Sequence, residues 1–310
     1  MSQGGGPTTG SSGPPGPGGS PAVPRTAREV LALARGFLER KGLGEARLEA
    51  ELLVAHALKV DRLGLFMRLD APIQDAELDR ARDSLVRRGR REPTAYIVGH
   101  REFFGRDFAV GPGALVPRPE TELIVDLARE RIPASARGGL RVVDVGTGSG
   151  CLAVTLALEL EGASVDAIDL SEDALGWASR NADALSANII FHRGDGLEEL
   201  GELAGTGGPF DLIVSNPPYV EPTERELLSP EVREHEPPLA LYAPAEDPDH
   251  WARALIQLAG QVLKPGGLLL VELGHLQGAR VHALASASGA RSAEIVDDLA
   301  GVPRVLALVR

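Results

Sequence analysis

The run Asn-Pro-Pro-Tyr at residues 216–219 has the residue types needed to hold a planar NH₂ group. The Asn216 side chain and the Pro217 main chain each offer a carbonyl, and successive prolines stiffen the loop without adding N–H donors. Tyr219 adds a flat face for stacking. Two acceptors that hold the hydrogens of such a nitrogen aim it at an electrophile and favour the positive charge that develops on it. The alternative is a proline turn that only ends a strand.

A glycine-rich turn lies upstream, in the order Asp144-Val145-Gly146-Thr147-Gly148-Ser149-Gly150, between a strand-like run and a helix-like run. Glycines let the backbone approach a ligand closely, and the helix that follows presents free N–H groups to it. The spacing is G-x-G-x-G, whereas a dinucleotide-binding fold needs G-x-G-x-x-G. The turn therefore favours a ligand site other than a dinucleotide site, and a turn without any ligand is the alternative.

Asp169 directly follows the next strand-like run of the chain. A carboxylate at this place can accept hydrogen bonds from both hydroxyls of a ribose. By itself, Asp169 is better explained as a solvated residue that caps a helix beginning near Ser171. Taken together with the glycine turn upstream, ribose binding is the favoured interpretation.

The segments that must position these residues alternate between strand-like and helix-like patterns. Strand-like runs cover residues 140–145, 164–168, 188–191, 210–214 and 268–272. This alternation predicts an α/β fold with a mostly parallel sheet and helices on both faces. Such sheets bind ligands at the carboxyl ends of their strands, so the three segments above are expected to face one crevice. Residues 302–309 follow another strand-like run and predict a hairpin appended to the sheet.

The chain is predicted to have four parts. Residues 1–24 carry no charge and are rich in Gly, Pro, Ser and Thr, which predicts a disordered tail. Residues 25–92 are predicted to form a small helical domain, whose first helix begins with the capping box of Thr26 and Glu29. Residues 93–112 are expected to form a β-hairpin linker, and residues 113–310 the α/β domain.

Composition argues against several classes of protein. The net charge of −12 disfavours direct binding to nucleic acid through its phosphates. The single cysteine, Cys151, excludes an internal disulfide and a multi-cysteine zinc site, and we expect it to be a packing residue. No apolar run is long enough to span a bilayer, and the N-terminus has the pattern of neither a secretory signal nor a mitochondrial presequence, so a cytoplasmic location is expected. The acidic loop 244–251 is expected to be solvated, and no metal site is predicted.

Several further motifs give the chain its resemblance to a known family. They are Pro117-Arg118-Pro119-Glu120-Thr121-Glu122, Pro93-Thr94-Ala95-Tyr96-Ile97-Val98-Gly99 with Phe103-Phe104-Gly105, Glu236-Pro237 with Ala240-Leu241, Glu272-Leu273-Gly274 with Gln277-Gly278, and Asp298-Leu299-Ala300-Gly301. Together with residues 216–219 and the glycine turn, these motifs resemble those of the HemK/PrmC family, the release-factor glutamine methyltransferases. The resemblance covers nearly all of the chain after Arg25.

The resemblance implies a class I methyltransferase fold, which is Rossmann-like, with a helical N-terminal domain that helps to hold the substrate. It implies S-adenosylmethionine as the cofactor, and N5-methylation of the glutamine in the Gly-Gly-Gln loop of class I peptide-chain release factors. Asn216, Pro217 and Tyr219 are then catalytic, and Pro218 joins them in binding the substrate. The implied cofactor-binding residues are Gly146, Thr147, Gly148, Ser149, Gly150, Asp169, Asp195, Gly196 and Asn216.

Three alternatives stay open at this point. A ribosomal-protein glutamine methyltransferase and a nucleic-acid amino-methyltransferase use similar motifs, and a non-catalytic protein could bind the nucleoside alone. The chain also departs from the family in two places. Gly196 follows Asp195, where the family often has a bulky residue beside the adenine, and residues 244–251 replace a Gly-rich stretch.

Overall fold

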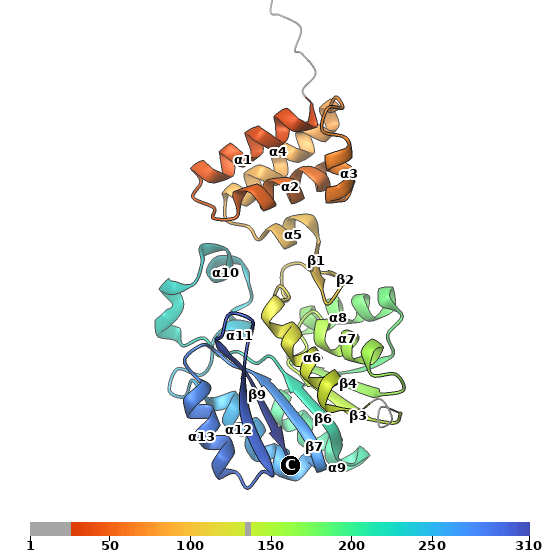
Figure 1. Ribbon diagram of the computed structural model, residues 1–310, viewed down its shortest axis with the longest axis vertical. Coiled ribbons are helices and arrows are strands. Elements are labelled where there is room, and N and C mark those ends of the chain that lie inside the picture. Colours follow the sequence, from red (N-terminus) through yellow and green to blue (C-terminus); the bar gives the residue numbers. More distant parts are fainter. Residues whose placement is uncertain (1–25, 134–137) are drawn as a thin grey trace, which may run out of the picture. The chain divides into compact units, whose positions relative to one another are not determined.

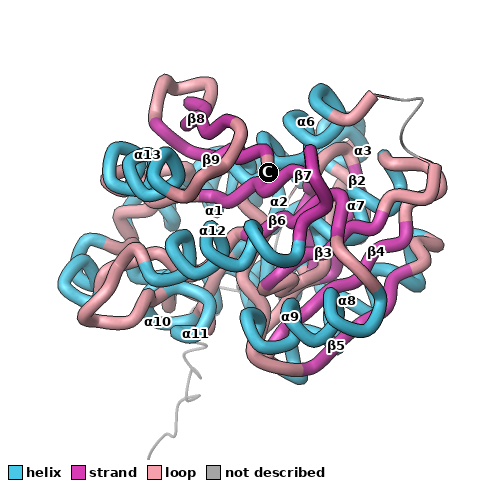
Figure 2. The backbone as a smooth tube through the Cα atoms, turned by 90° about the horizontal axis from the view of Figure 1, so that it is seen from below, coloured by secondary structure: helices cyan, strands magenta, loops and turns pink. Residues whose placement is uncertain are grey.

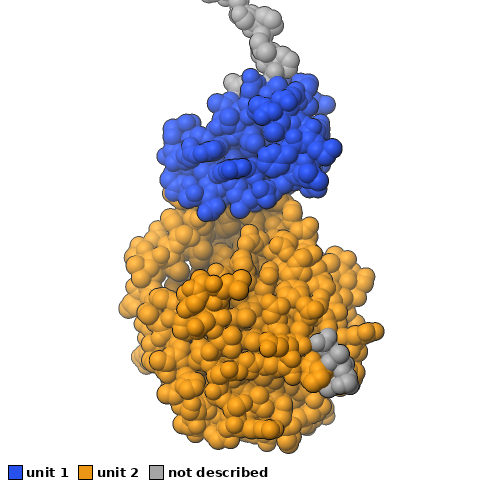
Figure 3. Space-filling model, viewed as in Figure 1, with its two compact units in different colours: residues 1–85 blue, residues 86–310 orange. Residues whose placement is uncertain are grey.

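The computed structural model describes residues 26–133 and 138–310, so the predicted tail at residues 1–24 lies outside the described part. The chain forms two compact units, Met1–Leu85 and Val86–Arg310 (Figure 3). The division falls inside helix α4 (Asp75–Gly89), a few residues before the domain end expected at residue 92. Among the described residues, no helix is both long and apolar enough to cross a membrane.

The described part of the first unit is helical, as its periodicity predicts. It contains α1 (Ala27–Arg40), α2 (Ala46–Ala57), α3 (Arg62–Met67) and the first part of α4. The capping box of α1 is present: the Glu29 amide donates to the Thr26 hydroxyl at 3.3 Å, and the Glu29 carboxylate accepts from the Thr26 amide at 3.0 Å. Helix α1 buries Val30, Ala34 and Leu38, which recur at the spacing of one helical face.

After the last residues of α4, the second unit continues with a short helix and a β-hairpin. Residues 96–98 belong to helix α5 (Thr94–Val98), which ends at Gly99 in the left-handed conformation. The hairpin pairs β1 (His100–Phe103) with β2 (Arg106–Ala109), so its turn is Phe104-Gly105. Phe103 and Phe108 are fully buried and meet edge to face, with ring centroids 6.0 Å apart, which fixes the hairpin to the core of this unit.

The described residues of the second unit form a seven-stranded sheet, and this confirms the predicted fold class (Figure 1). In sequence order its strands are β3 (Arg141–Val145), β4 (Ser164–Asp169), β5 (Ile189–Arg193), β6 (Phe210–Ser215), β7 (Leu263–Glu272), β8 (Ser292–Asp297) and β9 (Pro303–Val309). The spatial order is β5-β4-β3-β6-β7-β9-β8. The first five strands are parallel, and the predicted C-terminal hairpin adds β9, which is antiparallel to β7, and β8, which is antiparallel to β9.

Helices cover both faces of the sheet (Figure 2). One face packs on α6 (Glu122–Arg131), α7 (Cys151–Glu159) and α8 (Glu172–Leu185), and the other on α9 (Gly196–Gly207), α12 (His250–Val262) and α13 (Gly278–Ala287). Neighbouring residues of a strand enter opposite cores, as Val142 and Val143 of β3 do. Burial on both faces explains why central strands such as β6 and β7 contain continuous apolar runs in the sequence.

Short helical segments surround the carboxyl ends of β6 and β7. They are η1 (Pro119–Thr121) before α6, and η3 (Pro222–Leu227), α10 (Pro230–His235) and α11 (Pro238–Leu241) between β6 and α12. Main-chain hydrogen bonds from Val220 to Leu241 at 2.9 Å and from Ala243 to Val220 at 3.0 Å close this excursion into a loop. The loop therefore starts and ends beside residues 216–219.

Candidate active site

A cavity of about 400 Å³ lies at the carboxyl ends of the parallel strands. Strand β3 pairs with β4 on one side and with β6 on the other, so the strand order reverses at β3, which is where open α/β sheets bind ligands. The predicted site residues that line the cavity are Gly146, Thr147, Gly148, Ser149, Asp169, Asp195, Gly196, Asn216, Pro217 and Pro218. Two further predicted residues, Gly150 and Tyr219, lie outside this lining.

The glycine turn adopts a conformation that requires its glycines. Gly146, Gly148 and Gly150 have φ values of 78°, 57° and 81°, in the left-handed region. A Cβ atom at Gly150 would also lie 2.9 Å from the Cα of Ala178 in α8, so the turn packs closely against this helix. The turn thus joins β3 to the N-terminus of α7 with its backbone along the cavity wall.

Asp144 lies beneath this turn and is fully buried. Its Oδ2 accepts hydrogen bonds from the Thr147 hydroxyl at 2.7 Å and the Ala153 amide at 3.2 Å, while Oδ1 has no partner among the described residues. Burial raises the pKa of Asp144 to about 7. Burial, together with the nearby Asp144 charge, also raises the pKa of Cys151 to about 12, which keeps this thiol protonated and suits it to packing.

Asp169 sits at the end of β4 with both carboxylate oxygens directed by main-chain donors. Oδ2 accepts from the Gly148 amide at 2.8 Å, and Oδ1 accepts from the Ser171 amide at 2.9 Å. Burial raises its pKa, and the main-chain hydrogen bonds oppose that rise. Each oxygen keeps a second lone pair for a ligand on the cavity side, so the carboxylate can still accept two hydroxyl donors. The helix-capping alternative is filled instead by Ser171, whose hydroxyl accepts from the Ala174 amide.

Asp195 and Gly196 form another part of the wall. Asp195 caps α9, since its Oδ1 accepts from the Leu197 and Glu198 amides at 3.0 and 3.3 Å. A Cβ atom at Gly196 would lie 2.8 Å from Val145 Cγ1 and 3.6 Å from Trp251 Cζ3. Trp251, which lines the cavity, therefore supplies an aromatic surface beside the position that lacks a bulky side chain.

Asn216 and Pro217 present acceptors at the end of β6. The Asn216 Nδ2 donates to the Thr121 hydroxyl at 3.0 Å, and its Oδ1 accepts no hydrogen bond from the described residues. Pro217 is buried, and its carbonyl likewise accepts no hydrogen bond from the described residues. The Ser215 hydroxyl donates to the Val145 carbonyl at 2.7 Å and so ties the end of β6 to the end of β3. The glycine turn and the two acceptors are thereby held at one place.

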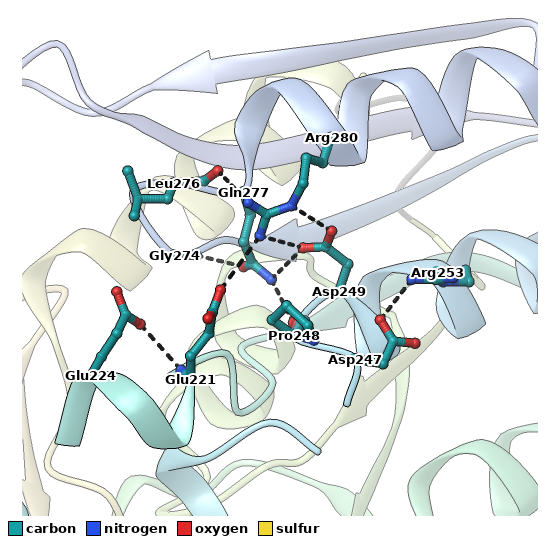
Figure 4. A network of polar contacts seen from close by, with 10 residues as sticks. All are labelled: Glu221, Glu224, Asp247, Pro248, Asp249, Arg253, Gly274, Leu276, Gln277 and Arg280. Atoms are coloured by element: carbon teal, nitrogen blue, oxygen red, sulfur yellow. Dashed lines mark hydrogen bonds and ion pairs between the residues drawn. The ribbon is translucent and has the colours of Figure 1, made fainter. Parts of the chain in front are cut away.

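Tyr219 lies outside the cavity lining. Its hydroxyl donates to Glu272 Oε1 at 3.2 Å, and its ring packs on Gly274, where a Cβ atom would be 3.1 Å from Cδ2. Gly274 is held by Gln277, whose Oε1 accepts from the Gly274 amide at 2.8 Å (Figure 4). The Tyr219 ring is thus fixed by the segment that follows β7, and its stacking on a substrate stays a prediction.

The acidic loop 244–251 is tied to neighbouring helices by ion pairs (Figure 4). Asp249 binds Arg280 of α13 at 2.7 Å, and Asp247 binds Arg253 of α12 at 2.6 Å. Within residues 26–133 and 138–310, no group of three or more His, Cys, Asp or Glu side chains is placed to hold a metal ion.

Helix α8 connects the hairpin to the glycine turn through one side chain. Asn181 is buried; its Oδ1 accepts from the Ala109 amide at 2.7 Å, and its Nδ2 donates to the carbonyls of Ala109 and Ser149 at 3.0 and 2.8 Å. Trp177 is half-buried, and its Nε1 donates to the Pro112 carbonyl at 3.1 Å. Both side chains position the segment that runs from β2 into the cavity wall.

Sequence reasoning gave no role to two other residues of the wall, Arg118 and Trp251. The Arg118 guanidinium donates to Glu236 Oε1 at 2.6 Å, and Glu236 Oε2 accepts from the Val116 amide at 3.2 Å. Arg118 and Glu236 belong to motifs on which the resemblance depends, and this was the one indication of their importance. Their pairing spans more than a hundred residues, which no local pattern predicts.

Comparison with known proteins connects this geometry to a family. The family models described as PrmC N-terminal domain and methyltransferase small domain match residues 29–99 and 123–229. A release factor glutamine methyltransferase of Geobacter sulfurreducens is 42% identical over 281 residues, covering 91% of this chain and 95% of that protein. That of Bacillus subtilis is 39% identical over 285 residues, covering 91% and 97%. The crystal structure of a release factor-specific protein-(glutamine-N5) methyltransferase from Alicyclobacillus acidocaldarius is 35% identical and covers 66% of this chain and 99% of that chain, with a TM-score of 0.43.

These relatives match the chain over most of both sequences, so the similarity is not limited to the methyltransferase sheet. The first family model matches the helical region and the second matches the segment that contains the glycine turn and residues 216–219. The resemblance read from the motifs is therefore confirmed. The chain belongs to the release factor glutamine methyltransferase family and is a methyltransferase enzyme.

Proposed function

We propose that this enzyme transfers a methyl group from S-adenosylmethionine to the side-chain amide nitrogen of the glutamine in the Gly-Gly-Gln loop of class I peptide-chain release factors. The observation that carries the proposal is the pair of acceptors at the end of β6, Asn216 Oδ1 and the Pro217 carbonyl. Both are left without a protein donor among the described residues, at a cavity that also contains Asp169. A primary amide has two N–H donors, which such a pair can accept.

The cavity suits a nucleoside cofactor. Its volume of about 400 Å³ is within the range of ligand pockets, roughly 300–1,000 Å³. Asp169 keeps lone pairs for two ribose hydroxyls, the glycine turn provides closely approaching backbone, and Trp251 with Asp195 forms the wall expected beside the adenine. When bound, S-adenosylmethionine supplies a methyl group on a positively charged sulfur for in-line displacement.

The residues of the site act by positioning and electrostatics. An amide nitrogen is a poor nucleophile because its lone pair is delocalised into the carbonyl. Asn216 Oδ1 and the Pro217 carbonyl hold its two hydrogens, which orients the lone pair and stabilises the positive charge that grows on the nitrogen. Since neither carbonyl is a base, the proton released from the methylated nitrogen passes to water.

The choice of substrate is supported by the relatives, whose names state release factors and glutamine. A ribosomal-protein glutamine and an exocyclic amine of a nucleic-acid base are the competing substrates, because either group fits the same two acceptors. The net charge of −12 disfavours binding of a nucleic-acid substrate through its phosphates.

The test is incubation with S-adenosylmethionine carrying a labelled methyl group and, in parallel, a class I release factor, a ribosomal protein or DNA. Mass mapping is expected to find one labelled methyl group on the glutamine of Gly-Gly-Gln, and a release factor with this glutamine changed to alanine is the control. Label that appears only on the ribosomal protein or on DNA would contradict the proposal.

A further inference from the structure

A chain of buried hydrogen bonds leads from Asn216 through Thr121, which also lines the cavity, to Glu272 outside the lining. The Asn216 Nδ2 donates to Thr121 Oγ1 at 3.0 Å, and the Thr121 hydroxyl donates to Glu272 Oε2 at 2.5 Å. Thr121 and Glu272 are 2% and 1% exposed, so water does not compete for these bonds. Thr121 belongs to η1 and Glu272 ends β7, so residues far apart in the sequence meet behind the acceptor.

The direction of these bonds follows from the chemistry of the groups. An ionised carboxylate can only accept, so the Thr121 hydroxyl must point its single hydrogen at Glu272. The Thr121 oxygen then has only lone pairs to offer to Asn216. An amide that faces lone pairs turns its NH₂ group toward them, which directs its carbonyl oxygen the opposite way.

We propose that Thr121 and Glu272 are positioning residues that fix the orientation of the Asn216 side-chain amide, so that Oδ1 and not Nδ2 faces the substrate. An amide in the reversed orientation would present two N–H donors to the NH₂ group of the substrate, and the two groups of donors would repel each other. The inference rests on the proposed function, because it assigns Asn216 Oδ1 the task of holding the substrate amide.

The surroundings of Glu272 connect this network to pH. Burial raises the pKa of Glu272 to about 6, against the hydrogen bond from Thr121 and the positive charge of Arg304. Tyr219 and Glu120 also face this carboxyl, and the charge of Glu272 contributes to the raised pKa of Cys151. Protonation below this pH removes the acceptor-only character of the group and weakens the charge-assisted bond that orients Thr121. Turnover is therefore expected to fall as the pH falls through about 6.

The kinetic test compares Thr121→Val, which removes the hydroxyl at nearly the same volume, with Thr121→Ser, which keeps it. Removing a partner that orients a ligating group costs about 10–100-fold in metal sites, and we expect a fall in kcat of this order for Val, with the affinity for S-adenosylmethionine changed less than about twofold. Ser should restore most of the turnover. Thr155→Val is the matched control, because Thr155 is fully buried and its hydroxyl has no partner among the described residues.

The pH profile adds a result that mere packing would not produce. The kcat of the wild type and of Thr121→Ser is expected to fall as the pH falls through about 6. The kcat of Thr121→Val should not show this decrease, because Asn216 is no longer linked to the Glu272 carboxylate by hydrogen bonds. The inference is overturned if Thr121→Val has the same kcat as the wild type, or if Thr121→Ser and Thr121→Val lose kcat equally. It is also overturned if the kcat of Thr121→Val still falls as the pH decreases through about 6.

A second measurement does not depend on the release factor. With ¹⁵N-labelled asparagine, the side-chain NH₂ signals of Asn216, assigned from Asn216→Asp, should move with pH near 6 in the wild type and stay fixed in Thr121→Val. Signals that behave alike in both proteins overturn the network, whatever the enzyme methylates. If the wild type shows the expected signals but methylates no release factor, the hydrogen-bond network is supported and the proposed substrate is refuted.

Discussion

At the scale of single residues, Asn216 is the side chain whose loss should separate the methyl-transfer step from cofactor binding. In the proposed mechanism, Asn216→Ala removes an acceptor that matters most as charge develops on the substrate nitrogen, so kcat is expected to fall about 10²–10³-fold. Affinity for S-adenosylmethionine should change little. Single-turnover methylation of a release factor, with calorimetry of cofactor binding alongside, measures both quantities. If residues 216–219 are only a strand-ending turn, the folded variant will turn over nearly as fast as the wild type.

Asp169→Ala is expected to act on cofactor affinity. The change removes the carboxylate that is proposed to accept two ribose hydroxyls, and also the partner of the Gly148 amide. Hydrogen bonds to a charged group contribute about 1.5–3 kcal/mol, so affinity should fall about tenfold to a hundredfold. Glu172→Ala is a suitable control, because Glu172 is an exposed acid at the start of α8 that pairs with Arg193 of β5. Calorimetry that finds equal affinities for wild type and Asp169→Ala would remove this residue from the site.

Individual site residues could be predicted where they directly follow a strand. Asn216, Asp169 and the glycine turn were found in this way, because the ends of parallel strands meet at one edge. Trp251 could not be assigned, since its place beside Gly196 depends on how α12 packs. The bonds of Thr121 to Asn216 and Glu272 also join distant segments, and only the tertiary structure brings them together.

At the scale of elements, apolar runs predicted the parallel strands closely, whereas short or glycine-containing elements were missed. Helix α5 has five residues and contains β-branched and aromatic types, so its residues 96–98 read as a strand. Strand β7 begins at Leu263, five residues before the predicted start at 268. The prediction missed this first part because Pro265 and two glycines interrupt the apolar pattern. Its pairing with β6 has a register shift at the same place.

The glycine turn permits a test at this scale with two glycines. Gly150→Ala places a Cβ in a left-handed conformation and 2.9 Å from Ala178, so it should lower both Tm and cofactor affinity. Gly176→Ala lies on the same helix as Ala178, in open space, and should stabilise α8 by about 0.5–1 kcal/mol. Thermal unfolding and cofactor titration of both variants check this. A Gly150→Ala enzyme as stable as the wild type would show that the turn tolerates a side chain.

At the scale of the whole molecule, buried acids make stability depend on pH. The pKa of Asp144 is raised from 3.8 to about 7, mainly by burial, so the folded protein holds this proton more tightly than the unfolded chain does. Its contribution is full below about pH 4 and is lost as the pH rises through about 7. Asp144→Asn cannot ionise and keeps an oxygen for Thr147 and Ala153.

Relative to the wild type, Asp144→Asn should therefore become progressively more stable between pH 5 and pH 8. Urea unfolding at unit steps of pH measures the free energy of unfolding of both proteins. Two curves that stay parallel over this range would mean that Asp144 titrates alike in the folded and unfolded states.

Asn181 has a mechanical consequence for the second unit. The Asn181 side chain is hydrogen-bonded to the main chain of Ala109 in the hairpin and of Ser149 in the glycine turn, so we expect these two segments to move together. A ligand that reduces the motion of one segment should then reduce the motion of the other. The Ala109 amide, which donates to Asn181, should exchange its hydrogen with solvent more slowly once S-adenosylmethionine is bound, and Asn181→Ala should abolish this change. Hydrogen exchange at the Ala109 amide of the hairpin would then report whether the cofactor is bound.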